Sequence, residues 1–122
     1  MTVERRRAAW RRGRRGEMAA LVALVLRGYR ILARDLRSPV GEIDIVARRG
    51  RAIVFIEVKA RGSHRVAAEA LLGRQRRRIA RAAARFLAAR PELAGTEARF
   101  DVILVAPWRW PRHLIDAWRI DW

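Results

Sequence analysis

Hydrophobic and polar positions alternate in the first half of the chain, and this alternation predicts strands. Between the last two of these segments, Arg49-Gly50 predicts a two-residue hairpin turn in which glycine supplies the positive φ. A fourth apolar run, rich in β-branched residues, predicts another strand in the second half. The expected strands cover residues 29–36, 42–47, 52–59 and 100–106.

Two segments have the apolar spacing of helices. Residues 16–27 are apolar on nearly every side, so we expect a helix buried against the sheet. Residues 66–90 predict a second helix that ends before Pro91. Residues 115–118 predict a short final strand or, alternatively, a short helix.

This order of elements predicts one small α/β domain over residues 16–122, with an αβββαβ core and a mixed sheet flanked by helices. Residues 1–15 contain seven arginines and little periodic apolar content, and we expect a mobile basic arm. The arm is either a loose contact for phosphate groups or an untethered tail.

The predicted hairpin places acidic side chains on one face. Pairing through the Arg49-Gly50 turn sets Asp44 opposite Phe55 and Glu42 opposite Glu57. That face then holds three carboxylates and Lys59. The other face is wholly apolar, and we expect the hydrophobic core on this apolar face. A slip of one residue would break this arrangement, because strand side chains alternate between faces.

Charge is the strongest feature of the composition. The 122 residues carry a net charge of +16, which favours a polyanionic partner: nucleic acid first, an anionic membrane surface second. The apolar run at residues 18–26 is too short to span a membrane and lacks a cleavage site, so export is the weaker alternative. The absence of cysteine excludes thiolate zinc sites and fits the cytoplasm.

Lys59 is the only lysine among 28 basic residues, and it follows Glu57 by two positions. Three neighbouring carboxylates need a compensating cation, and hard oxygen ligands suit Mg²⁺ or Mn²⁺. Beside such a metal, an ammonium can orient or deprotonate a nucleophile in phosphodiester hydrolysis, which a guanidinium does less well. The alternative is that Lys59 only pairs with Glu57 or Glu42.

Asp44 followed by Glu57-Val58-Lys59 resembles the D…(D/E)-x-K signature of restriction-endonuclease-like nucleases. More closely, the chain resembles the YraN family of small bacterial proteins related to Holliday-junction resolvases. The segments that carry this resemblance are Gly16-Glu17, Gly28-Tyr29, GEID at 41–44, FIEVKAR at 55–61 and RFD at 99–101.

The resemblance implies that Asp44 and Glu57 hold the metal, that the carbonyl of Val58 completes the shell, and that Lys59 is catalytic. It implies that Glu17 is aimed at the same site; from the residues alone, Glu17 is equally a carboxylate at a helix N-terminus. The chain departs from the family in two places. Ile43 replaces the proline of the signature, and Arg74-Gln75 stands where a lysine is usual.

The second predicted helix has two distinct sides. Gln75 lies on the sheet-facing stripe, where it contacts either the site or the backbone. The opposite side predicts a ridge that binds nucleic acid without sequence specificity, or else a solvated face. The ridge consists of Arg74, Arg77, Arg78, Arg81 and Arg85.

Two features of the last segment have simpler interpretations. Asp101 is expected to be structural and paired with an arginine. Trp108, Trp110, Trp118 and Trp122 are expected to pin the chain end to the core, with stacking on unpaired bases as the alternative.

Together these observations predict a Mg²⁺-dependent (or Mn²⁺-dependent) endonuclease acting on DNA, with branched or damaged DNA as the substrate by analogy alone. The alternative is a nucleic-acid-binding module on a nuclease fold without catalysis of its own. DNA is the expected partner, a membrane is not, and a two-fold homodimer stays open.

Overall fold

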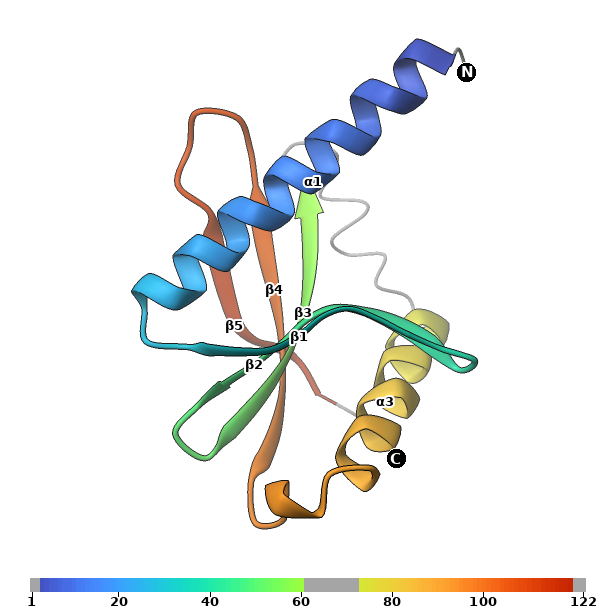
Figure 1. Ribbon diagram of the computed structural model, residues 1–122, viewed down its shortest axis with the longest axis vertical. Coiled ribbons are helices and arrows are strands. Elements are labelled where there is room, and N and C mark those ends of the chain that lie inside the picture. Colours follow the sequence, from blue (N-terminus) through green and yellow to red (C-terminus); the bar gives the residue numbers. More distant parts are fainter. Residues whose placement is uncertain (1–2, 61–72, 120–122) are drawn as a thin grey trace.

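The computed structural model describes residues 3–60 and 73–119 (Figure 1). Over these two ranges, two helices, one 3-10 turn and five strands follow one another. They are α1 (Val3–Leu26), β1 (Arg30–Ser38), β2 (Gly41–Arg49), β3 (Ala52–Ala60), α3 (Gly73–Ala88), η1 (Pro91–Leu93), β4 (Glu97–Val105) and β5 (Arg112–Trp118).

The strands form one five-stranded mixed sheet in the order β1-β2-β3-β4-β5. Strands β3 and β4 are parallel and the other neighbours are antiparallel. The long connection between the parallel pair contains α3, as a parallel crossover requires. The predicted α/β class is confirmed, and the architecture is consistent with a restriction-endonuclease-like core.

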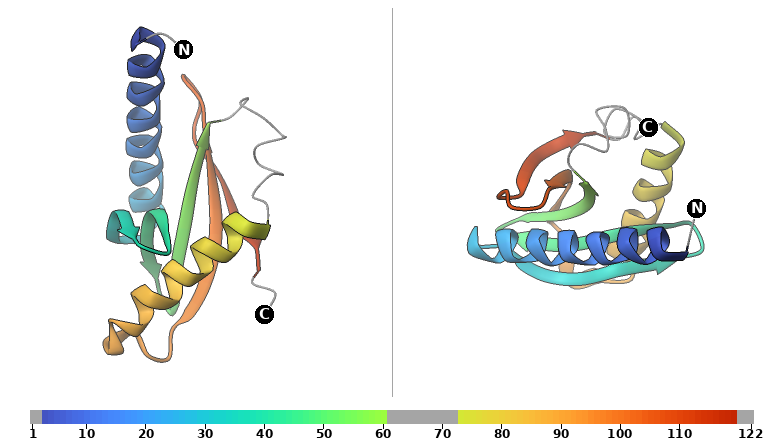
Figure 2. Two further views of the ribbon diagram at one scale, coloured as in Figure 1. Left: turned by 90° about the vertical axis from the view of Figure 1, so that its right-hand side faces the viewer. Right: turned by 90° about the horizontal axis from the view of Figure 1, so that it is seen from above.

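The two helices cover opposite faces of this sheet (Figure 2), and each face carries its own hydrophobic core. The core under α1 is built from Ala20, Leu21, Leu24, Tyr29, Ile45, Ala47, Val54, Ile56 and Ile103. The core under α3 includes Val46, Ile53, Phe55, Ile79, Ala82, Ala83, Phe86, Phe100, Val102 and Trp118. The expectation of a core on one face only was wrong, because the acidic face becomes apolar toward the hairpin turn.

The hairpin register differs from the prediction by two residues. Arg49 pairs with Ala52, so the turn consists of Gly50 and Arg51, and Gly50 has the expected positive φ of 60°. The last pair is Ile45 with Ile56, and Asp44 and Glu57 are therefore the next positions on their strands. Because strand side chains alternate between faces, a shift of two residues leaves Asp44 and Glu57 on the same face, as predicted.

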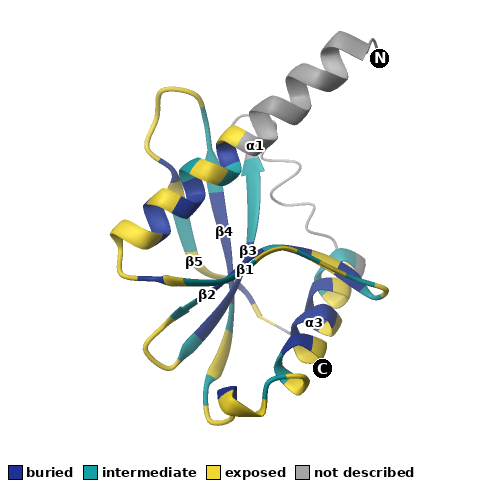
Figure 3. Cartoon of the chain, in the orientation of Figure 1, coloured by how far each residue is buried: buried dark blue, intermediate teal, exposed yellow. Residues whose placement is uncertain are grey.

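Helix α1 differs from the prediction in length and in burial. It begins at Val3, so most of the expected basic arm is helical; the mobility of the arm stays a prediction. Over residues 15–26, where burial is described, only one side of the helix is buried (Figure 3). The large hydrophobic side chains of Met18, Val22, Val25 and Leu26 are each at least half exposed.

Within the described ranges, no helix is long and apolar enough to cross a membrane.

The second half of the chain contains the expected elements with shifted bounds. Helix α3 is described from Gly73, and the predicted helical residues 66–72 lie outside the described part. The final element is a strand, which decides between the two alternatives.

Only part of the expected pinning by tryptophan is observed. Trp118 is buried and stacks on Phe100, with ring centroids 4.2 Å apart. Trp108 and Trp110 are exposed and pin nothing, so the expectation was wrong for them. Trp122 lies outside the described residues.

Candidate active site

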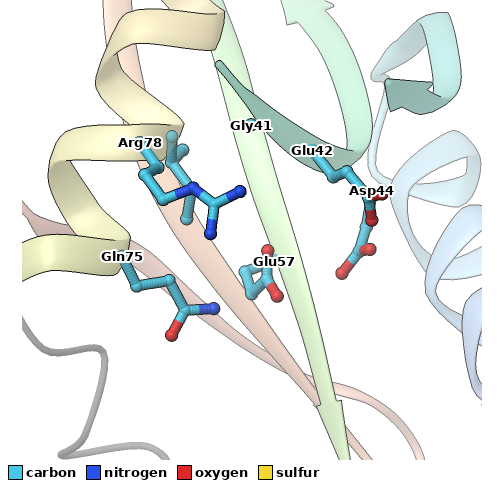
Figure 4. A pocket seen from close by; sticks show the side chains of 7 residues that line it. Gly41, Glu42, Asp44, Glu57, Gln75 and Arg78 are labelled. Carbon is cyan, nitrogen blue, oxygen red and sulfur yellow. The ribbon is translucent and has the colours of Figure 1, made fainter. Parts of the chain in front are cut away.

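A pocket of about 340 Å³ lies between β2, β3 and α3 (Figure 4). The elements meet there because the sheet twists and α3 packs on the first half of β2. Its lining residues are Gly41, Glu42, Asp44, Glu57, Gln75, Arg78 and Ile79. The structure thus places Asp44 and Glu57 at one pocket, as the sequence predicts, together with Gln75, for which this was one of two alternatives.

Asp44 is held by the backbone of the neighbouring strand. Its Oδ2 accepts a hydrogen bond of 2.8 Å from the N–H of Val58. Burial raises the pKa of Asp44 above its ordinary value, and the Val58 N–H and the charge of Lys59 only partly oppose this. The Asp44 carboxylate is therefore fixed in position, but nearby positive charge balances its negative charge only in part.

Glu57 is the most strongly perturbed carboxyl of the pocket. Burial, followed by the negative charge of Asp44, raises the pKa of Glu57 to about 7. Lys59 lowers it, with its Nζ 3.4 Å from Glu57 Oε1. The Lys59 side chain is 27% exposed and that of Glu57 15%, so the pair lies at the pocket rim. The predicted pairing of Lys59 with Glu57 is present.

Glu17 approaches the same region from α1. A Cβ on the preceding Gly16 would lie 2.6 Å from Val105 Cγ2, so a larger residue there would require the Val105 side chain to shift. Glu17 Oε1 is buried with no hydrogen-bond partner among the described residues. Burial and the neighbouring Asp35 raise the pKa of Glu17 to about 7, and the charge of Asp44 contributes. Because α1 begins at Val3, Glu17 is not at a helix N-terminus, and that alternative was wrong.

Sequence reasoning missed Asp35. This residue of β1 has a left-handed backbone, with φ of 46°, and its charge acts on both Glu17 and Asp44. No sequence motif identifies Asp35. It comes close to Glu17 and Asp44 only because α1 packs beside β1. An aspartate with positive φ is uncommon enough to signal a special position.

Gly41 sets the distance between β2 and α3. A Cβ at this position would lie 2.8 Å from the backbone oxygen of Arg78, which is tighter than real contacts allow. The close approach brings Gln75 and Arg78 opposite Glu57, and both side chains extend into the pocket (Figure 4). The half-buried Gln75 therefore faces the pocket, as the site alternative requires.

The predicted arginine ridge is largely a solvated surface. Arg77, Arg78, Arg81 and Arg85 are exposed, and the side chain of Arg74 lies outside the described part. Arg78 also lines the pocket, so the ridge and the acidic pocket are continuous. The exposed arginines of α3 therefore adjoin the carboxylates of the pocket.

Asp101 is structural, as predicted. It is completely buried and receives two hydrogen bonds from Arg99, at 2.9 and 2.8 Å. Its Oδ2 lies 2.6 Å from His113 Nε2, and the Arg99 guanidinium also bonds the Tyr29 hydroxyl. These bonds overcome burial and lower the pKa of Asp101. Asp101 of β4 pairs with Ile56 of β3, whose side chain lies in the core under α1. Asp101 is therefore on the opposite face of the sheet from Glu57.

The acidic side chains do not form a complete metal cage by themselves. Over residues 3–60 and 73–119, no three Asp, Glu or His side chains converge closely enough to hold one ion. A metal bound at Asp44 and Glu57 would take its further ligands from the backbone, water or substrate. Expected ligation by the Val58 carbonyl stays a prediction.

Comparison with known proteins identifies close relatives. The model of the family described as "Uncharacterised protein family UPF0102" matches residues 16–105. A UPF0102 protein of Parvibaculum lavamentivorans is 58% identical, over 92% of this chain and 84% of the relative. A UPF0102 protein of Paramagnetospirillum magneticum is 56% identical, over 93% and 92% of the two chains.

Proposed function

Since this chain belongs to the UPF0102 family, the YraN family that the motifs resemble, we propose that it is a Mg²⁺- or Mn²⁺-dependent endonuclease acting on DNA phosphodiesters. The observation that carries this proposal is the partly buried pair Asp44 and Glu57, with Lys59 Nζ 3.4 Å from Glu57 Oε1. Two desolvated carboxylates beside one amine form an environment that a divalent cation would neutralise.

The residues present fit such a cation. Asp44, Glu57 and the Val58 carbonyl offer only hard oxygen donors, which Mg²⁺ and Mn²⁺ prefer. The buried Glu17 Oε1 without a partner is a further acceptor that a metal-bound water could satisfy. The small number of protein ligands suits Mg²⁺, which usually keeps several waters and shares the substrate phosphate.

The chemistry is divided among the side chains of the pocket. A bound divalent ion would polarise the phosphate and lower the pKa of a water molecule. The Lys59 ammonium lies beside Glu57, where it can orient the attacking water and stabilise negative charge on the phosphate oxygens. Gln75 and Arg78 extend from α3 toward Glu57, where they can position the phosphodiester.

DNA binding is proposed for the exposed arginines of α3. Arg77, Arg78, Arg81 and Arg85 carry positive charge along the helix, and Arg78 connects them to the pocket. Contacts of this kind read phosphate and shape rather than base sequence. They predict binding that weakens steeply with salt, because each neutralised phosphate releases counterions.

A cleavage assay with purified protein tests the proposal. The substrates are four-way junction, flap, duplex and single-stranded DNA, each with Mg²⁺, Mn²⁺ or EDTA. Lys59→Ala, Asp44→Ala and Glu57→Ala should each abolish cleavage while binding is nearly retained. Glu97→Ala, an exposed glutamate at the start of β4, is the matched control and should cleave like the wild type. Activity retained in all three site variants would refute the proposal.

One observation favours a second candidate, a DNA-binding module without catalysis of its own. The described carboxylates do not form a preformed three-ligand group, and Asp44 Oδ2 already bonds the Val58 N–H. This candidate predicts salt-sensitive binding with no turnover under any metal condition. Metal-dependent cutting that disappears in Lys59→Ala would refute it.

A further inference from the structure

The loop between β4 and β5 holds two exposed tryptophans. Trp108 is fully exposed and Trp110 is 56% exposed, whereas Trp118 at the end of β5 is buried. Single exposed apolar residues are ordinary on a protein surface. In this loop Arg109 stands between the two tryptophans in the sequence, so two exposed indoles and a positive charge fall within three residues.

The backbone at Trp108 is strained. The Arg109 N–H lies 3.4 Å from the Ala106 oxygen, closing a turn with Pro107 second and Trp108 third. Trp108 has φ of 62°, a position that turns of this type normally give to glycine. A bulky side chain at positive φ is a genuine outlier, and such outliers cluster at ligand-binding sites.

The loop lies at the Lys59 end of the sheet. Lys59 pairs with Leu104 and Ala60 with Val105 in the parallel ladder, and the loop follows Val105 directly (Figure 1). Trp108 is four residues beyond Leu104, and an extended chain covers about 3.3 Å per residue. The Trp108 backbone is thus within roughly 13 Å of Leu104 and, with a strand spacing of about 4.8 Å, within roughly 18 Å of the Lys59 backbone.

We propose that Trp108 stacks on an unpaired nucleobase while Arg109 contacts the adjoining phosphate. The indole supplies a flat face that accepts any base, and the neighbouring guanidinium matches the charge of the backbone. At about 3.4 Å per stacked nucleotide, the stacked base then lies at most roughly five nucleotides from a phosphate at Lys59. This inference rests on the proposed action on DNA and deepens it, because it selects substrates with unpaired bases beside a duplex.

A binding measurement separates stacking from charge. The full chain is titrated in EDTA into a fluorescent duplex bearing a four-nucleotide single-stranded flap, and into the same DNA with an abasic flap. Both DNAs have the same number of phosphates, so their electrostatic attraction cancels in the affinity ratio. Wild type should bind the flap with bases roughly 5- to 100-fold more tightly.

Two variants make the result interpretable. Trp108→Gly removes the ring and gives the turn the residue that its backbone prefers, so loss of folding cannot explain weaker binding. In Trp108→Gly, the ratio of affinities for the flap with bases and the abasic flap should fall to about one. Trp108→Phe keeps an aromatic face and should retain most of the preference for the flap with bases.

The outcomes distinguish this inference from the proposed function. An unchanged ratio in Trp108→Gly, or an equal loss on both flaps, would overturn stacking and leave the nuclease proposal standing. No binding to either DNA by wild type would overturn both. The expected ratios together with absence of metal-dependent cleavage would support stacking and refute the nuclease.

Discussion

The raised pKa of Glu57 predicts that the metal-free protein loses stability as pH rises. The folded protein holds the Glu57 proton up to a pKa of about 7, whereas the ordinary pKa of a glutamate side chain is 4.5. A group that binds its proton more tightly in the folded state stabilises the protein fully below the unfolded pKa. This contribution is lost between about pH 4.5 and 7, where the folded state must ionise a buried carboxyl.

The magnitude follows from the two pKa values. At 1.36 kcal/mol per pH unit, the difference between about 7 and 4.5 corresponds to about 3 kcal/mol. About 2.5 kcal/mol of this falls between pH 5 and pH 8. The Glu57 side chain is 15% exposed, so solvent screens this effect only slightly.

The perturbation that tests this reasoning is Glu57→Gln, which keeps the shape and removes the titration. Unfolding by guanidinium chloride, followed by tryptophan fluorescence in EDTA, gives the free energy of unfolding at pH 5, 6, 7 and 8. Relative to wild type, the variant should gain about 2.5 kcal/mol between pH 5 and pH 8. Glu97→Gln, an exposed match, should follow wild type. An identical pH dependence in wild type and Glu57→Gln would refute the account of the site.

Three further predictions concern the metal, the core and the packing of the pocket. Mg²⁺ should raise the melting temperature of wild type more at pH 8 than at pH 5, because it binds the ionised carboxylates. If Mg²⁺ raised the melting temperature of Asp44→Ala as much as that of wild type, this prediction would be contradicted. Asp101→Ala should lower the free energy of unfolding by about 3–5 kcal/mol in the same denaturant assay, because Arg99 and His113 lose their buried partner; a loss below about 1 kcal/mol would contradict it. Gly41→Ala should cost about 1–3 kcal/mol, because its Cβ meets a backbone oxygen at 2.8 Å, and unchanged stability would show that α3 shifts freely.

The prediction of strands succeeded because alternation is a local property. The hairpin between β2 and β3 brings Asp44 and Glu57 to one face as the pattern indicates, although the turn is one residue later than expected. The even shift preserved the shared face, since side chains repeat every two residues. The same pattern predicted the core that lies under α1 but missed the second core under α3, because the burial of that second face depends on where α3 packs.

The sequence by itself determined the α/β order, the excess of positive charge and the Asp44, Glu57 and Lys59 set, because each of these depends on residues close together in the chain. Only the tertiary structure decided that Glu17 approaches the carboxylates from the middle of α1, that Asp35 acts on both Glu17 and Asp44, and that Trp108 stays exposed. These placements depend on close backbone approaches, such as those at Gly16 and Gly41, and on which element covers each face of the sheet. Contacts between distant segments are set by packing, which no local pattern encodes.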